Sequence, residues 1–86
     1  MEKNFSNVFV IIKFLADNNS ASWVRRILVE WYGKEFYDIR HVRKAAKQAM
    51  KMLKGINNLY DHHIAAVEAE FLLQLGKLPP DIKEEA

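Results

Sequence analysis

Basic side chains recur at intervals of three and four residues along one stretch of the chain, which places them on a single face of a helix. At 100° per residue they fall within an arc of about 100°. They are Arg40, Arg43, Lys44, Lys47, Lys51 and Lys54, and we call them the basic face. No acidic residue stands between Arg40 and Tyr60. Because guanidinium and ammonium groups bind phosphate oxygens, the basic face predicts contact with the backbone of a nucleic acid.

Crowding these cations on one helix has an energetic cost that an anionic partner would relieve. The six like-charged pairs three or four residues apart weaken the isolated helix by about 1–3 kcal/mol. Three other interpretations stay open: the face binds an acidic protein or an anionic membrane surface, it is simply solvated, or it is neutralised within the chain. Residues 59–86 could supply that neutralisation, because they hold six acidic residues and two lysines.

Groups that could perform catalysis or hold a metal are sparse. The chain has no cysteine, its serines stand where predicted helices begin, and its three glycines stand where predicted helices end. His62 and His63 are adjacent on a helix and point about 100° apart, so they cannot easily share one ion. His41 has only Asp38 at a spacing that would complete a helical pair. We therefore expect no enzymatic activity, no cofactor and no metal site.

Four aromatic side chains gather around the end of the predicted second helix. Exposed rings there could stack on bases or anchor a partner. A small domain also needs large side chains to fill its core, which explains the group more simply. We expect a hydrophobic plug where the second and third helices meet, with the two tyrosines partly exposed. The four residues are Trp31, Tyr32, Phe36 and Tyr37.

The first half of the chain holds two helical stretches that end in recognisable stop signals. The first follows Ser6, a good N-cap, and ends near Asp17. Its β-branched residues alternate in part, so a strand is the alternative, but the spacing by three and four favours a helix. The second helix begins after Ser20 or Ser22 and ends at Gly33, a residue suited to the left-handed position after a helix.

The second half predicts two more helices. The third runs from about Asp38, its N-cap, to Lys54, with Gly55 as the stop. The fourth follows a cap at Asn57 or Asn58 and ends at Gly76, the third glycine of the chain. The expected fold is therefore all-α, a compact bundle of three to four helices with short loops.

The predicted fourth helix carries two apolar stripes on nearly opposite sides. One consists of Tyr60, Ile64, Val67, Phe71 and Leu75, and the other of Leu59, Ala66, Ala69 and Leu73. A peripheral helix of a monomer needs only one apolar stripe. The second stripe indicates either a central helix packed on both sides or a face buried by another copy of the chain. Few elements are available to surround a central helix, so we expect a homodimer that uses the second stripe.

Length, composition and charge define the setting of these features. The chain has 86 residues and a net charge of +2, enough for one domain over 1–78 followed by a short acidic tail over 79–86. The near-neutral total hides a polarised chain, with +5 over 38–58 and −4 over 59–86. The longest apolar stretch is too short to cross a bilayer, which needs about 20 residues. A cleaved secretory signal is disfavoured because Lys13 interrupts this stretch, so we expect a cytoplasmic protein.

These observations favour a small non-enzymatic nucleic-acid-binding or regulatory protein that places the basic face on phosphates. The alternative is a protein–protein interaction module, such as a small inhibitor or adaptor. That module would bind an acidic partner through the basic face or an apolar partner through the fourth helix.

Overall fold

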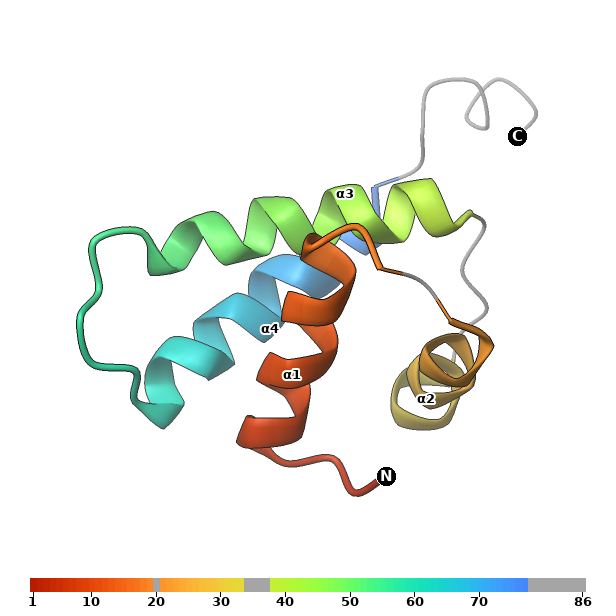
Figure 1. Ribbon diagram of the computed structural model, residues 1–86, viewed down its shortest axis with the longest axis horizontal. Coiled ribbons are helices and arrows are strands. Elements are labelled where there is room, and N and C mark those ends of the chain that lie inside the picture. The colour runs from red at the N-terminus through yellow and green to blue at the C-terminus, as the bar shows by residue number, and fades with distance from the viewer. Residues whose placement is uncertain (20, 34–37, 78–86) are drawn as a thin grey trace.

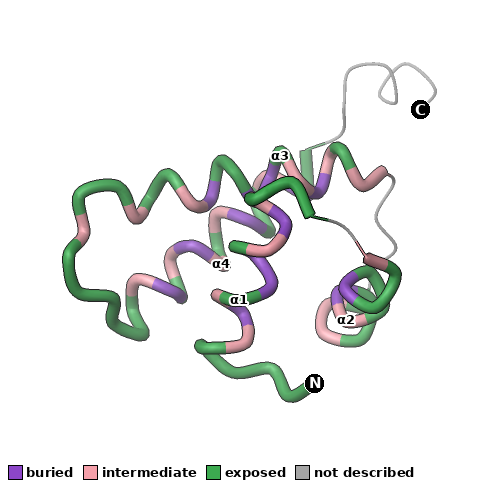
Figure 2. The backbone as a smooth tube through the Cα atoms, in the orientation of Figure 1, coloured by how far each residue is buried: buried purple, intermediate pink, exposed green. Residues whose placement is uncertain are grey.

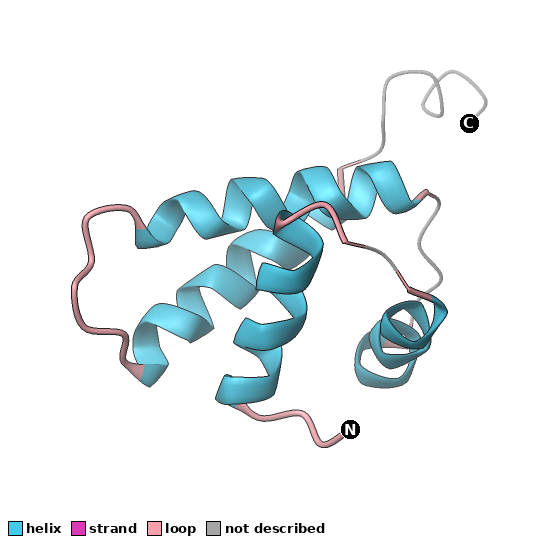
Figure 3. Ribbon diagram, in the orientation of Figure 1, coloured by secondary structure: helices cyan, strands magenta, loops and turns pink. Residues whose placement is uncertain are grey.

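The computed structural model describes residues 1–19, 21–33 and 38–77, and all regular structure in these ranges is helical. The helices are α1 (Phe5–Ala16), α2 (Ser22–Tyr32), α3 (Ile39–Met50), the short 3-10 helix η1 (Lys51–Leu53) and α4 (Asp61–Leu75) (Figure 1, Figure 3). The all-α fold class is confirmed, and the first apolar stretch is a helix rather than a strand. Within these ranges no helix is long and apolar enough to span a bilayer. The predicted tail lies outside the described residues.

Three predicted helix boundaries are confirmed by the local geometry. The Oδ1 atom of Asp38 accepts a hydrogen bond from the backbone N–H of Arg40 at 2.8 Å, which makes Asp38 the N-cap of α3. Gly33 ends α2 with φ of 65°, a left-handed conformation that costs glycine no steric strain. The fourth helix ends at Leu75, with Gly76 as its C-cap.

The first two helices begin at other residues than those predicted. Asn4 rather than Ser6 caps α1, because its Oδ1 accepts a hydrogen bond at 2.8 Å from a backbone N–H three residues later. The N-cap of α2 is Ala21, which has no side-chain acceptor, and Ser22 is already helical. Ser20, the other predicted cap, lies outside the described residues. Of these two helices, only α1 has a side-chain oxygen that caps its N-terminus.

The fourth helix begins later than predicted. Its N-cap is Tyr60 and its first helical residue is Asp61, so neither Asn57 nor Asn58 caps it. The backbone N–H of Tyr60 donates to Nδ1 of His63 at 2.9 Å. A histidine inside the first turn thus binds back to the N-cap, the position that Glu or Gln takes in a capping box.

The core lies where α1, α3 and α4 pack against one another, and α3 and α4 run antiparallel on either side of the connection 54–60 (Figure 1). Each of the four α-helices contributes buried residues to it (Figure 2). The buried residues are Val8, Ile11, Ile12, Leu15, Val24, Leu28, Val42, Ala45, Ala46, Ala49, Ile64, Val67, Phe71 and Leu75. The cationic side of α3 is therefore held outward by the alanine-rich side that packs inward.

The inner stripe of α4 is confirmed except at its first member. Ile64, Val67, Phe71 and Leu75 are buried, as predicted. Tyr60 is instead 58% exposed. The prediction fails there because the helix starts after Tyr60, so that the side chain no longer follows the helical period.

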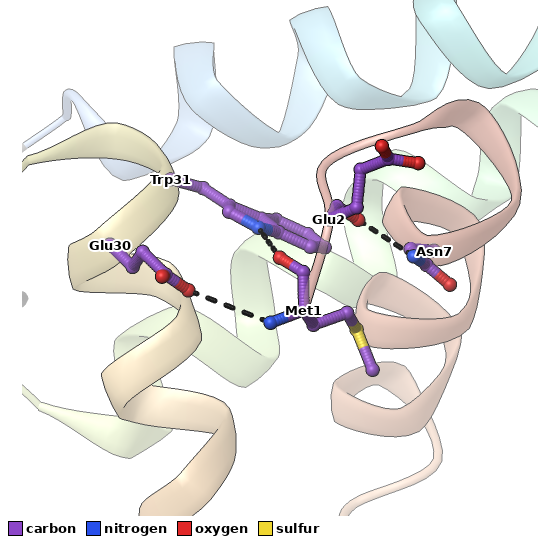
Figure 4. Close-up of polar contacts among 5 residues, drawn as sticks. All are labelled: Met1, Glu2, Asn7, Glu30 and Trp31. Atoms are coloured by element: carbon purple, nitrogen blue, oxygen red, sulfur yellow. Dashed lines mark hydrogen bonds and ion pairs between the residues drawn. The ribbon is translucent and has the colours of Figure 1, made fainter.

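The aromatic end of α2 is tied to the beginning of the chain. Nε1 of Trp31 donates to the backbone carbonyl of Met1 at 2.9 Å (Figure 4). The amino group of Met1 lies 3.8 Å from a carboxylate oxygen of Glu30 (Figure 4). Trp31 and Tyr32 are half-buried against the core, as expected of a plug, but α2 does not pack closely along α3. The other two aromatic residues of the predicted plug lie outside the described residues.

A polar contact joins α2 to α4. The hydroxyl of Tyr32 donates to Oε2 of Glu68 at 2.7 Å, and Nζ of Lys3 lies 3.0 Å from the same oxygen. Burial, together with the carboxylate of Glu68, raises the pKa of the Tyr32 phenol well above its ordinary value. Tyr32 therefore stays a neutral donor and fixes the end of α2 to the middle of α4.

Candidate nucleic-acid interface

The basic face begins at the first turn of α3, where Asp38 and Arg40 interact. Besides accepting the backbone N–H of Arg40, Asp38 lies 3.1 Å from a nitrogen of its guanidinium group. These bonds lower the pKa of the Asp38 carboxyl below its ordinary value, and the bond from the backbone N–H has the larger effect. The side chain of Arg40 is nevertheless 85% exposed. The helix cap thus orients this arginine without covering it.

Together with Arg40, four lysines form the exposed part of the basic face. They are Lys44, Lys47, Lys51 and Lys54. No carboxylate of the described residues lies within 4.0 Å of any of their amino groups. Their charges are therefore available to an anion from outside the described part of the chain.

Arg43 differs from the other members of the basic face. It is half-buried, and its Nε is covered without a hydrogen-bond partner among the described residues. By its spacing in the sequence, Arg43 was predicted to lie on the same helix face as the lysines. The angle of a residue around the helix axis does not show whether neighbouring elements cover its side chain. Arg43 presents less of its charged group to a partner than the four lysines do.

The α-helical part of the basic face ends before its last two lysines. The α-helix of α3 stops at Met50 rather than near Lys54, and Lys51 belongs to η1. Lys54 follows with an extended backbone, at φ −61° and ψ 127°. The prediction of one continuous α-helical stripe is therefore wrong at its C-terminal end, although both lysines are exposed where the chain turns toward α4.

Two of the three acidic residues of the fourth helix form contacts away from the basic face. Glu68 accepts a hydrogen bond from Tyr32 of α2 and forms an ion pair with Lys3. Glu70 accepts a hydrogen bond from Gln74 within α4. Asp61 occupies the first turn of α4, where the helix dipole favours an acid. The three remaining acidic residues of 59–86 lie outside the described residues. Within the described part of α4, no carboxylate is paired with the basic face.

Two of the three histidines form hydrogen-bonding contacts with the backbone. The rings of His62 and His63 are closer than the helical projection predicts, with centroids 4.1 Å apart. Nδ1 of His63 is committed to the N-cap of α4, and Nε2 of His41 lies 3.4 Å from the carbonyl oxygen of Leu75. In the described ranges no three His, Cys, Asp or Glu side chains are placed to hold an ion.

Three rings at the start of α4 form a group that the sequence did not predict. They are Tyr60, His62 and His63, which we call the ring cluster. The rings of Tyr60 and His62 are nearly parallel, with 11° between their planes and 5.9 Å between centroids. The ring of His63 lies 5.7 Å from that of Tyr60. The run Tyr-Asp-His-His was the available signal, but only the N-cap geometry brings its rings together.

The second stripe of α4 is exposed over most of its length. Ala69 is exposed, Ala66 is half-buried and Leu73 is 57% exposed, all on the side opposite the buried stripe. Leu59 is 41% exposed but precedes the helix, so it does not belong to the helical stripe. In the described residues, α4 is therefore not a central helix packed on both sides, which was one of the two predicted arrangements.

No protein-family model matches the chain, and the searches of curated proteins and of solved structures found no significant match.

Proposed function

We propose that this protein binds nucleic acid through the basic face of α3 and the turn that follows it. The observation that carries the proposal is the row of four exposed lysines without a carboxylate partner in the described part of the chain. Such a row contacts several phosphates at once and releases their counterions, which is the main source of sequence-independent affinity. Arg40 adds a fifth exposed cation beside its cap.

The proposed activity is binding rather than catalysis. Lysines direct a protein to the phosphate backbone and carry little information about base sequence. We propose a small non-enzymatic regulatory protein of the cytoplasm that recognises a polyanion by charge and shape.

A double charge reversal tests the proposal. Lys47→Glu with Lys51→Glu should abolish binding of a mixed-sequence oligonucleotide at low salt, while circular dichroism stays unchanged because both side chains are exposed. Arg25→Glu with Arg26→Glu is the matched control, since it makes the same charge change at two exposed positions of α2. Equal losses in both variants would mean that only net charge matters, and no binding by the original protein would reject the proposal.

An acidic protein surface is the second candidate partner for the same lysines. Partner capture from source-cell lysate separates the two, because nuclease treatment releases partners held through nucleic acid. Retention of the partner after nuclease treatment, with loss in the Lys47→Glu, Lys51→Glu variant, would favour a protein-interaction module.

We also propose that the outer side of α4 mediates self-association. Ala66, Ala69 and Leu73 lie together there, and Leu72 beside them is 38% exposed. Small side chains allow two helices to approach closely, and a two-fold dimer would present two copies of the basic face. Light scattering should give the mass of a dimer that Leu73→Glu converts to monomer. Val10→Glu, at a 50% exposed position of α1, should leave the dimer intact. A monomer mass for the original protein would reject this proposal.

A further inference from the structure

The ring cluster lies at the same end of the molecule as the last lysines of the basic face. The 3-10 helix η1, which contains Lys51, packs against α4. Lys54 follows η1 directly, and the chain then turns over 54–60 into the first turn of α4 (Figure 1). The row of cations therefore leads along α3 and η1 to a group of three rings, of which Tyr60 and His62 are exposed.

The rings are held in place although much of their surface is open. The hydrogen bond from the backbone of Tyr60 to His63 fixes the start of α4, and the near-parallel His62 ring lies beside that of Tyr60. Tyr60 is still 58% exposed, and His62 is also exposed. The aromatic surface is thus arranged by the fold without being used in the core.

Apolar side chains extend the exposed surface at this end. Met52 in η1 is 47% exposed, and Leu59, the residue before Tyr60, is 41% exposed. Cations that track a phosphate backbone beside exposed aromatic rings are the two components by which proteins bind single-stranded nucleic acid. In a duplex the faces of the bases are stacked on one another, so a ring of the protein cannot reach them.

We propose that the basic face and Tyr60 together bind single-stranded nucleic acid, with phosphates on Lys51 and Lys54 and an unpaired base stacked on the ring of Tyr60. This inference rests on the proposed function and narrows its ligand from any nucleic acid to a single strand. The sugar is left to experiment, because DNA and RNA share both the phosphate and the stacking surface of the base.

The test compares four probes by fluorescence anisotropy at low salt: oligothymidylate, oligouridylate, a duplex of equal charge, and inorganic polyphosphate as a polyanion without bases. Tyr60→Ala should weaken binding of a single strand by about 5- to 150-fold, the range for loss of one stacked base. The affinity of the Tyr60→Ala variant for polyphosphate should equal that of the original protein. Tyr60→Phe should bind like the original protein, because it keeps the ring and loses only the hydroxyl.

Trp23→Leu is the matched control, because Trp23 is an aromatic residue of α2 that is 41% exposed. The helix α2 lies at the opposite end of the molecule from the turn that joins α3 to α4 (Figure 1). It should leave the affinity for single strands unchanged. Equal affinity of Tyr60→Ala and the original protein for both single strands would overturn the inference, as would tighter binding of the duplex. In either case the proposed function stands if charge reversal of Lys47 and Lys51 still removes binding. Binding to none of the four probes would overturn both.

Discussion

The salt dependence of binding should report how many cations of the basic face reach phosphates. The sequence counts six cations, whereas the structure leaves four lysines exposed without a carboxylate partner in the described residues. For a single strand the slope of log K against log salt is about −0.7 per phosphate contact. The four lysines alone therefore give about −3, the lysines with Arg40 about −3.5, and all six cations about −4. With four contacts, affinity should fall by about 50-fold between roughly 50 and 200 mM salt.

Single lysine replacements sharpen this prediction. Lys47→Gln should reduce the steepness of the slope by about 0.7, because one counterion fewer is released. Arg43→Gln should leave the slope nearly unchanged, since Arg43 is half-buried with its Nε covered. Anisotropy titrations at several salt concentrations measure both slopes. A slope near zero, or a larger change for Arg43→Gln than for Lys47→Gln, would refute the assignment of phosphate contacts to the exposed lysines.

Three further predictions concern the fold that holds the interface. Phe71→Ala should lower the free energy of unfolding by about 3–5 kcal/mol, because Phe71 is fully buried; a loss under about 1 kcal/mol in urea unfolding would contradict the described core. The raised pKa of Tyr32 implies stability that is complete below 10.0 and declines as the pH rises above it. Tyr32→Phe should remove that part of the alkaline decline, and identical pH profiles would contradict the contact with Glu68. The lowered pKa of Asp38 implies stability that is present above 3.8 and lost as the pH falls through the lowered value. Asp38→Asn should keep the cap and flatten the acid limb of thermal-unfolding curves, and an unchanged acid limb would argue against the bonds from Arg40.

Local features of the sequence were sufficient for the class of fold and for the two-sided character of α3. Periodicity identified the helices, and Asp38, Gly33 and Gly76 marked boundaries, because capping depends on residues close together in the chain. The inner stripe of α4 followed from the same periodicity. The clustering of positive charge was equally visible, since six basic residues stand within residues 40–54 and no acidic residue stands among them.

The tertiary structure decided which of these side chains are available. Arg43 is partly covered and the neighbouring lysines are not, a distinction that depends on packing around α3 rather than on spacing. Because α4 begins after Tyr60, the side chain of Tyr60 does not follow the helical period that buries the inner stripe. It lies outside the core, beside the rings of His62 and His63. The sequence by itself therefore determined an all-helical chain with a cationic side. Which cations are open, and the exposed rings that adjoin them, arise from contacts between residues distant in the chain and from the position at which one helix begins.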